Sequence, residues 1–589
     1  MSSVLDAGRG AETRVPRERG QWATALRSGA AAWVALAVLV IATGALLYRE
    51  TRGTTLFLDE WTWLLHRRGN SLASFLDTHN GHLSLIPVAI YKLLFATAGI
   101  GSFGPYRALV IVAHLACCVL LFVYARARVG PLLALLAAAL LLLFGPGWEN
   151  MMWPFQTAFL LSLGAGLGAL LALDRLDRAG DVTACVLLTV SLASSGVGVP
   201  FVLGVALELG LRRRRLGDAW IVAVPLLLYA LWWVGYQHTG FRRHDIVLAP
   251  SFVYSAASAT LSALAGLAGS TGLDGQGTLM TWGPALLVAA IVAVAWRLVR
   301  IRRLEPRVAA LATMALSFWL LTALSRAYVS SPFASRYLYV GAFFVLLLAV
   351  ELLRGVSFTW WSSVVVGVAG AAAIVSNVGE LRDAGRMVRG YGQDTTADLG
   401  ALEIGRPVIP PGYVAQQVPG YPFVVIPAAS YFAATRSVGS PAATPAQILA
   451  DPESVRASVD AELIHIHRLG LLSVGHGVRL GSPPAVDSVT GGATAARGGC
   501  VIFAPDHFIP AGTTVAFAVT VPAEGLELQA SAAPATVGVR RFADAFSTLG
   551  TVTPGGPVAL LVAPDRSSQP WRVQLESTGR VAACGLRLG

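Results

Sequence analysis

Charged side chains are scarce in this 589-residue chain, at 13% of the residues, whereas soluble globular domains carry about a quarter. That shortage excludes a single soluble enzyme. The sequence also has no glycine-rich loop of the dinucleotide-binding or P-loop type, so we do not expect ATP-driven work from this chain. Lysine is nearly absent, with Lys92 the one example, so the net charge of +11 comes from arginine.

Apolar residues, in contrast, are abundant: 55% of the chain is hydrophobic and the mean hydropathy is +0.63. Stretches long enough to cross a bilayer recur up to about residue 377. The basic excess lies in the same part, with a net charge of about +12 before residue 378 and about −1 after it. This pattern is typical of positive-inside topology and of contact with anionic membrane lipids, so we exclude nucleic acid as a partner.

The sequence predicts a polytopic α-helical membrane protein of about 11 to 13 membrane helices, followed by an extracytoplasmic α/β region that ends in a β-sandwich. We expect a cytoplasmic tail over residues 1–27 and a membrane domain over 28–377 with a long outer loop at 49–82. A mixed α/β region is expected over 378–490 and the β-sandwich over 491–589. The arginine-rich, alanine-rich composition is typical of a bacterium, which places the protein in the inner membrane.

Arginine clusters predict the topology, because positive loops prefer the cytoplasm. The clusters are Arg126 with Arg128, Arg175 with Arg178, Arg212 to Arg215, Arg297 to Arg303, and Arg354. They all lie inside only if residues 83–99 and 252–269 do not complete a crossing. About eleven crossings then remain, and the chain beyond residue 377 lies outside.

Two cysteines mark the ends of the predicted sandwich. Short β-rich runs separated by turn residues begin near Gly499, with Cys500 in the first run and Cys584 in the last. A disulfide between them fits an exported domain in an oxidising compartment.

Most of the polar chemistry lies in the long outer loop. Asp59 and Glu60 stand among aromatic residues, and a carboxylate that is partly desolvated at the bilayer edge can act as a general base. His79 and His82 follow, just before an apolar segment. The two carboxylates are either functional or solvate the loop, and the histidines bind substrate, cap a helix or, as a weaker alternative, hold a divalent cation.

The pattern of one span, an acidic pair in a long outer loop and a histidine motif before the next apolar segment resembles the GT-C glycosyltransferases that use polyprenyl-phosphate sugars. Protein O-mannosyltransferases and aminoarabinose transferases are the members that it is similar to. The resemblance implies that Asp59 is catalytic with Glu60 beside it, that Glu149 is an acidic residue of the second outer loop, and that transfer inverts the anomeric carbon. The usual His-Pro-Pro or Lys-Pro-Pro motif is replaced here by His79-Asn80-Gly81-His82.

Arginines on the outer side run against the charge rule and so need a reason. Gripping the lipid phosphate is one reason, which makes Arg242, Arg243 and Arg336 candidates, with Tyr337 next to the last. The partners implied are a polyprenyl-phosphate-linked sugar, a glycan, lipid or protein acceptor, and membrane lipids. The alternatives are a transporter or flippase of lipid-linked sugars, and a non-catalytic scaffold that displays the exported domain.

Overall fold

The computed structural model describes residues 18–212, 216–236, 243–269, 277–301, 305–415, 426–474, 479–506, 510 and 513–587. It falls into two compact units. The first comprises Met1–Arg49, Leu76–Ile86 and Ala108–Ala384, and the second comprises Glu50–Phe75, Pro87–Arg107 and Gly385–Gly589. The long outer loop predicted from the sequence is therefore shared, because its acidic pair belongs to the second unit and its histidine motif to the first.

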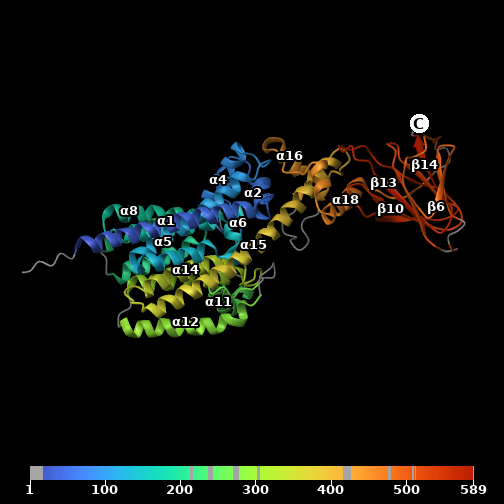
Figure 1. The fold of residues 1–589 in the computed structure, drawn as a ribbon. Coiled ribbons are helices and arrows are strands. Elements are labelled where there is room, and N and C mark those ends of the chain that lie inside the picture. The colour runs from blue at the N-terminus through green and yellow to red at the C-terminus, as the bar shows by residue number, and fades with distance from the viewer. Residues whose placement is uncertain are drawn as a thin grey trace, which may run out of the picture. The chain divides into compact units, whose positions relative to one another are not determined.

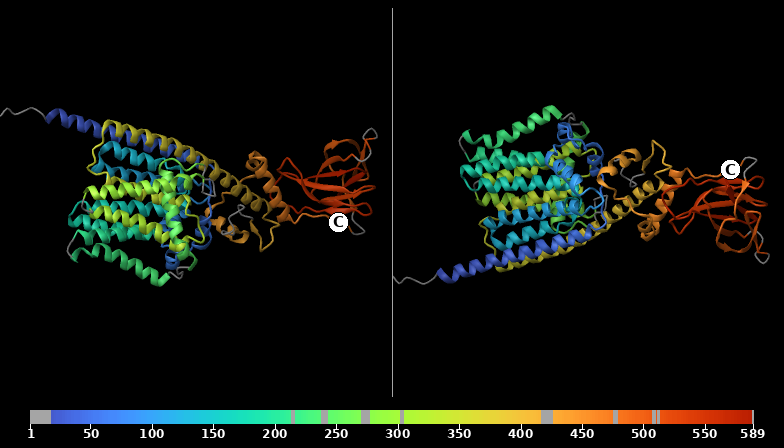
Figure 2. Two further views of the ribbon diagram at one scale, coloured as in Figure 1. Left: turned by 90° about the horizontal axis from the view of Figure 1, so that it is seen from below. Right: turned by 90° about the horizontal axis from the view of Figure 1, so that it is seen from above.

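The first unit is built from helices that run side by side (Figure 1; Figure 2). Within the described residues, eight helices are long and apolar enough to cross a membrane. They are α1 (Glu18–Glu50), α5 (Gly104–Leu142), α7 (Thr157–Leu173), α11 (Arg243–Leu264), α12 (Leu279–Ile301), α13 (Pro306–Arg326), α14 (Ser335–Leu352) and α15 (Trp360–Gly405). Three further helices in this unit are shorter or more polar: α8 (Arg178–Ser194), α9 (Gly198–Leu211) and α10 (Trp220–Tyr236).

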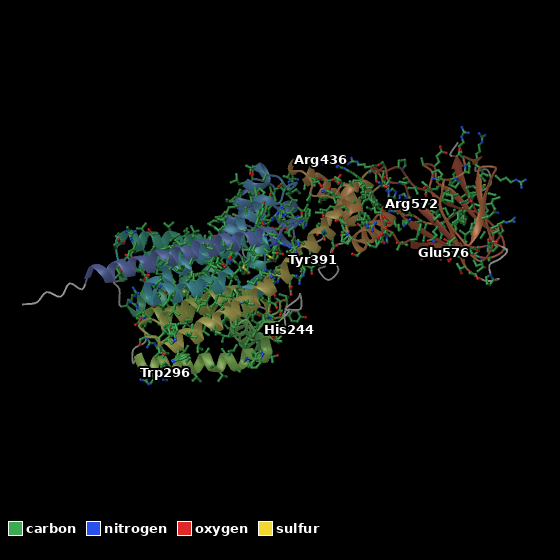
Figure 3. All side chains as sticks on the ribbon, in the orientation of Figure 1. His244, Trp296, Tyr391, Arg436, Arg572 and Glu576 are labelled. Carbon is green, nitrogen blue, oxygen red and sulfur yellow. A yellow bond between two sulfur atoms is a disulfide. The ribbon has the colours of Figure 1, made fainter. Side chains whose placement is uncertain are left out.

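Large apolar side chains remain exposed on the outside of these helices. Trp296 on α12 is 60% exposed (Figure 3), and Val299 and Val365 are exposed as well. Water would make such surfaces costly, whereas lipid tails solvate them without penalty. The first unit is thus that of a multi-pass membrane protein.

Helix α5 is two antiparallel helices joined at Gly130, whose φ of 81° interrupts the helical backbone just before Pro131. The carbonyl oxygen of Leu142 lies 3.2 Å from the Nε2 atom of His114. In one continuous helix, 28 residues would separate these groups by about 42 Å. The two halves of α5 on either side of Gly130 therefore pack as a hairpin.

Helix α11 begins and ends at the same end of the first unit. Near its start, the carboxylate of Asp245 accepts a hydrogen bond from the backbone N–H of Tyr328. Near its end, Asn377 Nδ2 donates to the carbonyl of Ala263, and a side chain at Gly145 would collide with the carbonyl of Asn377. The contacts at both ends agree with our expectation that residues 252–269 do not complete a crossing.

Helix α4 (Leu85–Thr97) has 13 residues and is therefore about 20 Å long. The hydrocarbon core of a bilayer is about 30 Å thick. A straight α4 is too short to span it, which agrees with the same expectation for residues 83–99.

A partly buried ion-pair network lies at the other end of these helices. Arg307 pairs with Glu208 at 2.7 Å and with Asp174 at 3.0 Å, and Arg128 pairs with Asp174 at 2.7 Å and also with Glu351. On the neighbouring helix, Arg297 donates to the carbonyls of Leu352 and Arg354. Of the predicted inner arginines, Arg128 and Arg297 take part in these contacts, whereas Arg213 to Arg215, Arg302 and Arg303 lie outside the described residues.

The second unit contains short helices and two larger β-sheets. Its helices are α2 (Asp59–His66), α3 (Leu72–Leu76), most of α4, α16 (Ala428–Val438), α17 (Pro445–Ala450) and α18 (Glu453–His467). A small sheet pairs β1 (Val414–Ala415) with β2 (Ile426–Pro427). The five-stranded sheet has the order β11-β10-β13-β8-β5, and the larger sheet the order β3-β12-β9-β14-β7-β6, with β4 paired to β14.

These sheets form a β-sandwich that extends beyond the predicted range of 491–589, because its first three strands precede residue 491. Their strands are β3 (Leu472–Ser473), β4 (Arg479–Leu480), β5 (Val486–Thr490), β6 (Gly492–Arg497), β7 (Cys500–Pro505), β8 (Val515–Thr520), β9 (Leu526–Ala530), β10 (Ala535–Arg540), β11 (Ser547–Val552), β12 (Val558–Leu560), β13 (Arg572–Ser577) and β14 (Val581–Arg587). Phe503 and Phe517, from different sheets, stack at 5.1 Å in the core. The disulfide between Cys500 and Cys584 is present and joins directly opposed residues of β7 and β14.

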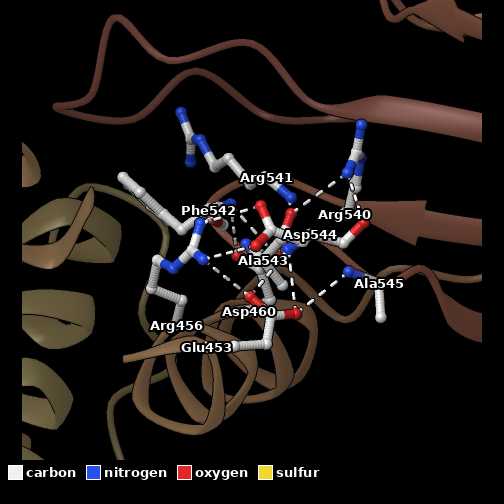
Figure 4. Close-up of polar contacts among 9 residues, drawn as sticks. All are labelled: Glu453, Arg456, Asp460, Arg540, Arg541, Phe542, Ala543, Asp544 and Ala545. Atoms are coloured by element: carbon white, nitrogen blue, oxygen red, sulfur yellow. Dashed lines mark hydrogen bonds and ion pairs between the residues drawn. The ribbon is translucent and has the colours of Figure 1, made fainter. Parts of the chain in front are cut away.

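Helix α18 is fixed to the sandwich by buried polar contacts (Figure 4). The carboxylate of Asp460 accepts hydrogen bonds from the backbone N–H groups of Arg541, Phe542 and Ala543. Beside it, Glu453 accepts from the backbone N–H of Asp544 at 2.9 Å. The carboxylate of Asp460 thus satisfies three backbone donors that would otherwise be unpaired, and these bonds attach α18 to the sandwich.

Candidate functional site

The residues proposed from the sequence fall into two sets. Asp59 and Glu60 belong to the second unit, and His79, His82, Glu149, Arg243, Arg336 and Tyr337 belong to the first. Arg242 lies outside the described residues, and Arg243 is the exposed first residue of α11.

Asp59 is the first residue of α2 and is half-buried. Leu58 before it adopts φ 46° and ψ −112°, a backbone conformation that leucine rarely occupies and that costs of order 1–3 kcal/mol. Such strain persists only where the surrounding structure holds the backbone in place, and it gathers at functional sites. An acidic residue in the first turn also stabilises a helix, so Asp59 has a structural role as well.

Glu60, the next residue, is completely buried. Its carboxylate accepts hydrogen bonds from the backbone N–H of Phe57 at 2.8 Å and from the hydroxyl of Tyr91 at 2.5 Å. Burial, and then the neighbouring Glu60, raise the pKa of Tyr91 well above its usual value, so the phenol remains a proton donor. Glu60 therefore anchors the start of α2 to α4.

Aromatic residues surround this part of α2 inside the second unit. Phe57 stacks on Tyr391 with ring centres 5.5 Å apart. Trp63 meets Tyr91 edge to face at 4.8 Å, and Trp61 lies 6.3 Å from Tyr431. Trp61 and Trp63 are both buried, so they pack within the unit.

The His79-Asn80-Gly81-His82 motif forms a tight turn. Asn80 and Gly81 have φ values of 51° and 78°, and the backbones of His79 and His82 exchange two hydrogen bonds of 3.1 and 2.9 Å. This is the geometry of a type I′ turn, for which Asn-Gly is the preferred pair. Arg326 donates to the carbonyl of Asn80 and so holds the turn to α13.

Both histidines of the turn point into protein. His79 is buried and lies 5.2 Å from the ring of Phe155. Gly196 leaves room for His82, because a Cβ at that glycine would come within 2.6 Å of the His82 Nδ1 atom. Burial, and secondly the charge of Arg326, lower the pKa of His82 to about 3, so its imidazole is neutral at physiological pH.

Glu149 and Arg336 form a direct pair. Arg336 Nη1 lies 3.0 and 3.2 Å from the two carboxylate oxygens of Glu149, and the backbone N–H of Arg336 donates to the same carboxylate at 2.9 Å. In return, Ser335 Oγ accepts from the backbone N–H of Glu149 at 3.0 Å. The guanidinium also lies 5.0 Å from the ring of Tyr337, which is buried. These contacts join the start of α6 (Glu149–Met152) to the start of α14.

Three polar residues close to Glu149 were not among the site residues proposed from the sequence. Asn150, Gln156 and Thr157 are at most 1% exposed, and each has a side-chain atom without a hydrogen-bond partner among the residues that the structure describes. Their polarity within a span that is otherwise aromatic was a signal, but nothing in the sequence says that an amide or hydroxyl is buried.

Metal binding was one alternative for the histidine pair. Among the described residues, no group of three or more His, Cys, Asp or Glu side chains is placed to hold a metal ion.

Comparisons with known proteins give structural neighbours only. No protein-family model matches the chain, and no curated protein matches its sequence. The chain is similar to ArnT from Cupriavidus metallidurans, solved by crystallography bound to undecaprenyl phosphate, with 15% identity and a TM-score of 0.41 over 66% of this chain and 83% of that chain. It is also similar to the mycobacterial arabinofuranosyltransferase AftD, with 13% identity and a TM-score of 0.34 over 94% of this chain and 58% of that chain.

The chain therefore spans little more than half the length of AftD. At such low identity a likeness gives no residue a role, so the roles argued below come from the geometry of this chain. What the structure itself defines is a multi-pass helical membrane unit together with a second unit that carries a disulfide-linked β-sandwich.

Proposed function

We propose that this protein is an inner-membrane glycosyltransferase of the GT-C kind, which moves a sugar from a polyprenyl-phosphate donor to a cell-envelope acceptor at the outer face of the membrane. The observation that carries the proposal is the strained backbone of Leu58, which presents a half-buried carboxylate at Asp59. Strain of this kind has a cost that folding alone does not explain. The names of the two structural neighbours, one bound to undecaprenyl phosphate and one an arabinofuranosyltransferase, agree with this class.

In the proposed reaction, Asp59 accepts the proton of an acceptor hydroxyl while that oxygen attacks the anomeric carbon of the sugar. The bond from the anomeric carbon to the phosphate oxygen breaks, and the lipid phosphate leaves with the electron pair. A single displacement of this kind inverts the anomeric configuration. Because the donor carries its energy in the phosphoester, the reaction needs no nucleotide.

We assign Glu60 to positioning rather than to proton transfer, because its carboxylate is fully buried and accepts hydrogen bonds from Phe57 and Tyr91. In the first unit, Arg336 is proposed to stabilise the phosphate, and Glu149 to hold its guanidinium in place. His82 is neutral, so its proposed contribution is hydrogen bonding and not charge.

Replacing Asp59 with Asn tests the base. We expect transfer from a polyprenyl-phosphate sugar to fall by a factor of about 10² to 10⁴, the usual contribution of a general base, while folding and lipid binding are kept. Asp77→Asn is the matched control, since Asp77 is an exposed acidic residue of the same predicted outer loop. Transfer within tenfold of the unmodified protein in Asp59→Asn would show that Asp59 is not the base.

Protein reconstituted into membranes tests the transporter alternative. Reconstituted protein that moves a lipid-linked sugar across the bilayer, but never transfers its sugar to any acceptor, would replace the proposed function with transport. Protein that does neither would favour the scaffold alternative.

A further inference from the structure

Three neighbouring residues of the first unit bury polar groups in an unusual way. Both amide atoms of Asn150, the Oε1 atom of Gln156 and the Oγ1 atom of Thr157 have no hydrogen-bond partner among the described residues. The exposed fraction of all three residues is 1% or less. Native proteins rarely leave buried polar atoms unpaired, and each such atom calls for an explanation.

The three residues come from one short, folded segment. Asn150 lies in α6 (Glu149–Met152), Gln156 ends the 3₁₀ turn η2 (Pro154–Gln156), and Thr157 begins α7. The turns α6 and η2 contact each other, and α6 also contacts α14. The segment begins at Glu149, whose carboxylate is paired with Arg336.

The chemistry of these groups indicates what they suit. An amide offers a donor and an acceptor, an amide oxygen accepts, and a hydroxyl does both, while none of the three carries charge. Neutral groups of this kind match sugar hydroxyls better than a phosphate, which favours cationic donors.

Aromatic rings border the same segment. Trp153 and Phe155 stack with ring centres 5.2 Å apart, and Phe155 also contacts the His79 ring at 5.2 Å. Flat rings beside neutral polar groups provide the apolar surface and the few placed hydrogen bonds that are typical of small-molecule sites.

We propose that Asn150, Gln156 and Thr157 form a subsite that binds the hydroxyl groups of the sugar, separate from the charged pair that faces the phosphate. The proposal rests on the proposed function, because it takes the ligand to be a lipid-linked sugar. It adds the class of group that the segment recognises, namely an uncharged polyol ring.

Apolar replacements of similar shape test the subsite: Asn150→Leu, Gln156→Met and Thr157→Val. Binding of undecaprenyl phosphate and of undecaprenyl-phosphate mannose, arabinose and glucose is measured on purified full-length protein in detergent. We expect at least one sugar-linked lipid to bind more tightly than bare undecaprenyl phosphate. Each variant should lose tenfold or more of its affinity for that sugar-linked lipid, with the affinity for the bare lipid unchanged.

Stability supplies a second readout. If these groups serve a ligand and not the fold, the variants lose only unpaired polar atoms, so the melting temperature without lipid should stay the same or rise. Ser258→Ala is the matched control, since Ser258 is another buried residue of this unit whose hydroxyl has no partner among the described residues. This control should leave both lipid affinities unchanged.

The outcomes separate the two proposals. If the unmodified protein binds neither lipid, the proposed function fails and the subsite fails with it. If it prefers a sugar-linked lipid but the variants keep that preference, the subsite alone is wrong. A lower melting temperature in all three variants would mean that the groups support the fold, and would also overturn the subsite.

Discussion

Tyr91→Phe should loosen helix α2 without disturbing the packing around it. The Tyr91 hydroxyl donates a hydrogen bond of 2.5 Å to the carboxylate of Glu60, which has no exposed surface. Hydrogen bonds to charged groups contribute about 1.5–3 kcal/mol, and a buried charge that loses a donor keeps its desolvation cost. The ring contacts of Tyr91 with Trp63, Phe95 and Tyr106 survive the change.

Native-state hydrogen exchange measures this effect directly, because it reports the local opening free energy of α2 and not the unfolding of the whole chain. A loss of 1.5–3 kcal/mol speeds the exchange of the α2 amides by a factor of about 10 to 150. The sugar-transfer rate should fall as well, because Glu60 fixes the helix that begins with Asp59.

Tyr106→Phe is the control for this prediction. Its hydroxyl donates to the backbone carbonyl of Gly99 at 2.8 Å, a neutral acceptor, and the ring belongs to the same cluster. This variant should alter α2 exchange much less than Tyr91→Phe. Unchanged α2 exchange in Tyr91→Phe, or an equal effect of both variants, would refute the idea that the Tyr91 to Glu60 bond holds α2 in place.

Three further predictions concern stability. The pKa of His82 is about 3 in the folded protein and 6.5 in the unfolded chain. The free energy of unfolding should therefore fall as the pH drops from 6.5 towards 3, by up to about 1.4 kcal/mol per pH unit. In His82→Asn, the melting temperature should not show this contribution to the pH dependence. The disulfide between Cys500 and Cys584 closes a loop of 84 residues. Replacing both cysteines with alanine should lower the free energy of unfolding of the sandwich by about 4.5 kcal/mol, measured by pulse proteolysis. Glu208→Gln leaves the buried Arg307 short of a counter-charge and should cost about 3–5 kcal/mol in a detergent unfolding assay, whereas an unchanged midpoint would contradict the network.

The helical part of the fold could be predicted well because a helix that crosses a bilayer needs a long run of apolar residues, which is visible in the sequence. The cluster of Arg126 and Arg128 predicts a loop between apolar segments, and Gly130 does end one helix there. The β-rich runs expected from about Gly499 onward correspond to β7 to β10 and β12 to β14.

Five strands of the sandwich were missed for a common physical reason. The side chains of β3, β4, β5 and β6 are almost all exposed, and β11 is partly so. Strand β6, Gly492–Arg497, is an edge strand of small residues that pairs with β7 through backbone hydrogen bonds. A strand that buries little carries no hydrophobic alternation, so its sequence looks like a loop.

Hydrogen bonds and ion pairs were harder to predict than helices and strands, because a sequence gives the spacing of residues but not which side chains come into contact. Glu60 stands next to Asp59 in one acidic pair, yet its hydrogen-bond partner Tyr91 is 31 residues away in the sequence. The link between Glu149 and Arg336 spans 187 residues. Each of these residues was singled out alone, from the cost of placing charge near lipid.

That cost explains which residues were found and which were not. A charged group near a bilayer must be compensated or functional, so its presence in an apolar sequence is informative by itself. A buried amide such as Asn150 is cheaper and ordinarily finds a partner in the fold, so only the structure can reveal that its amide atoms lack one among the described residues. Charged residues therefore indicate where chemistry lies, whereas neutral polar residues without partners indicate what kind of ligand fits there.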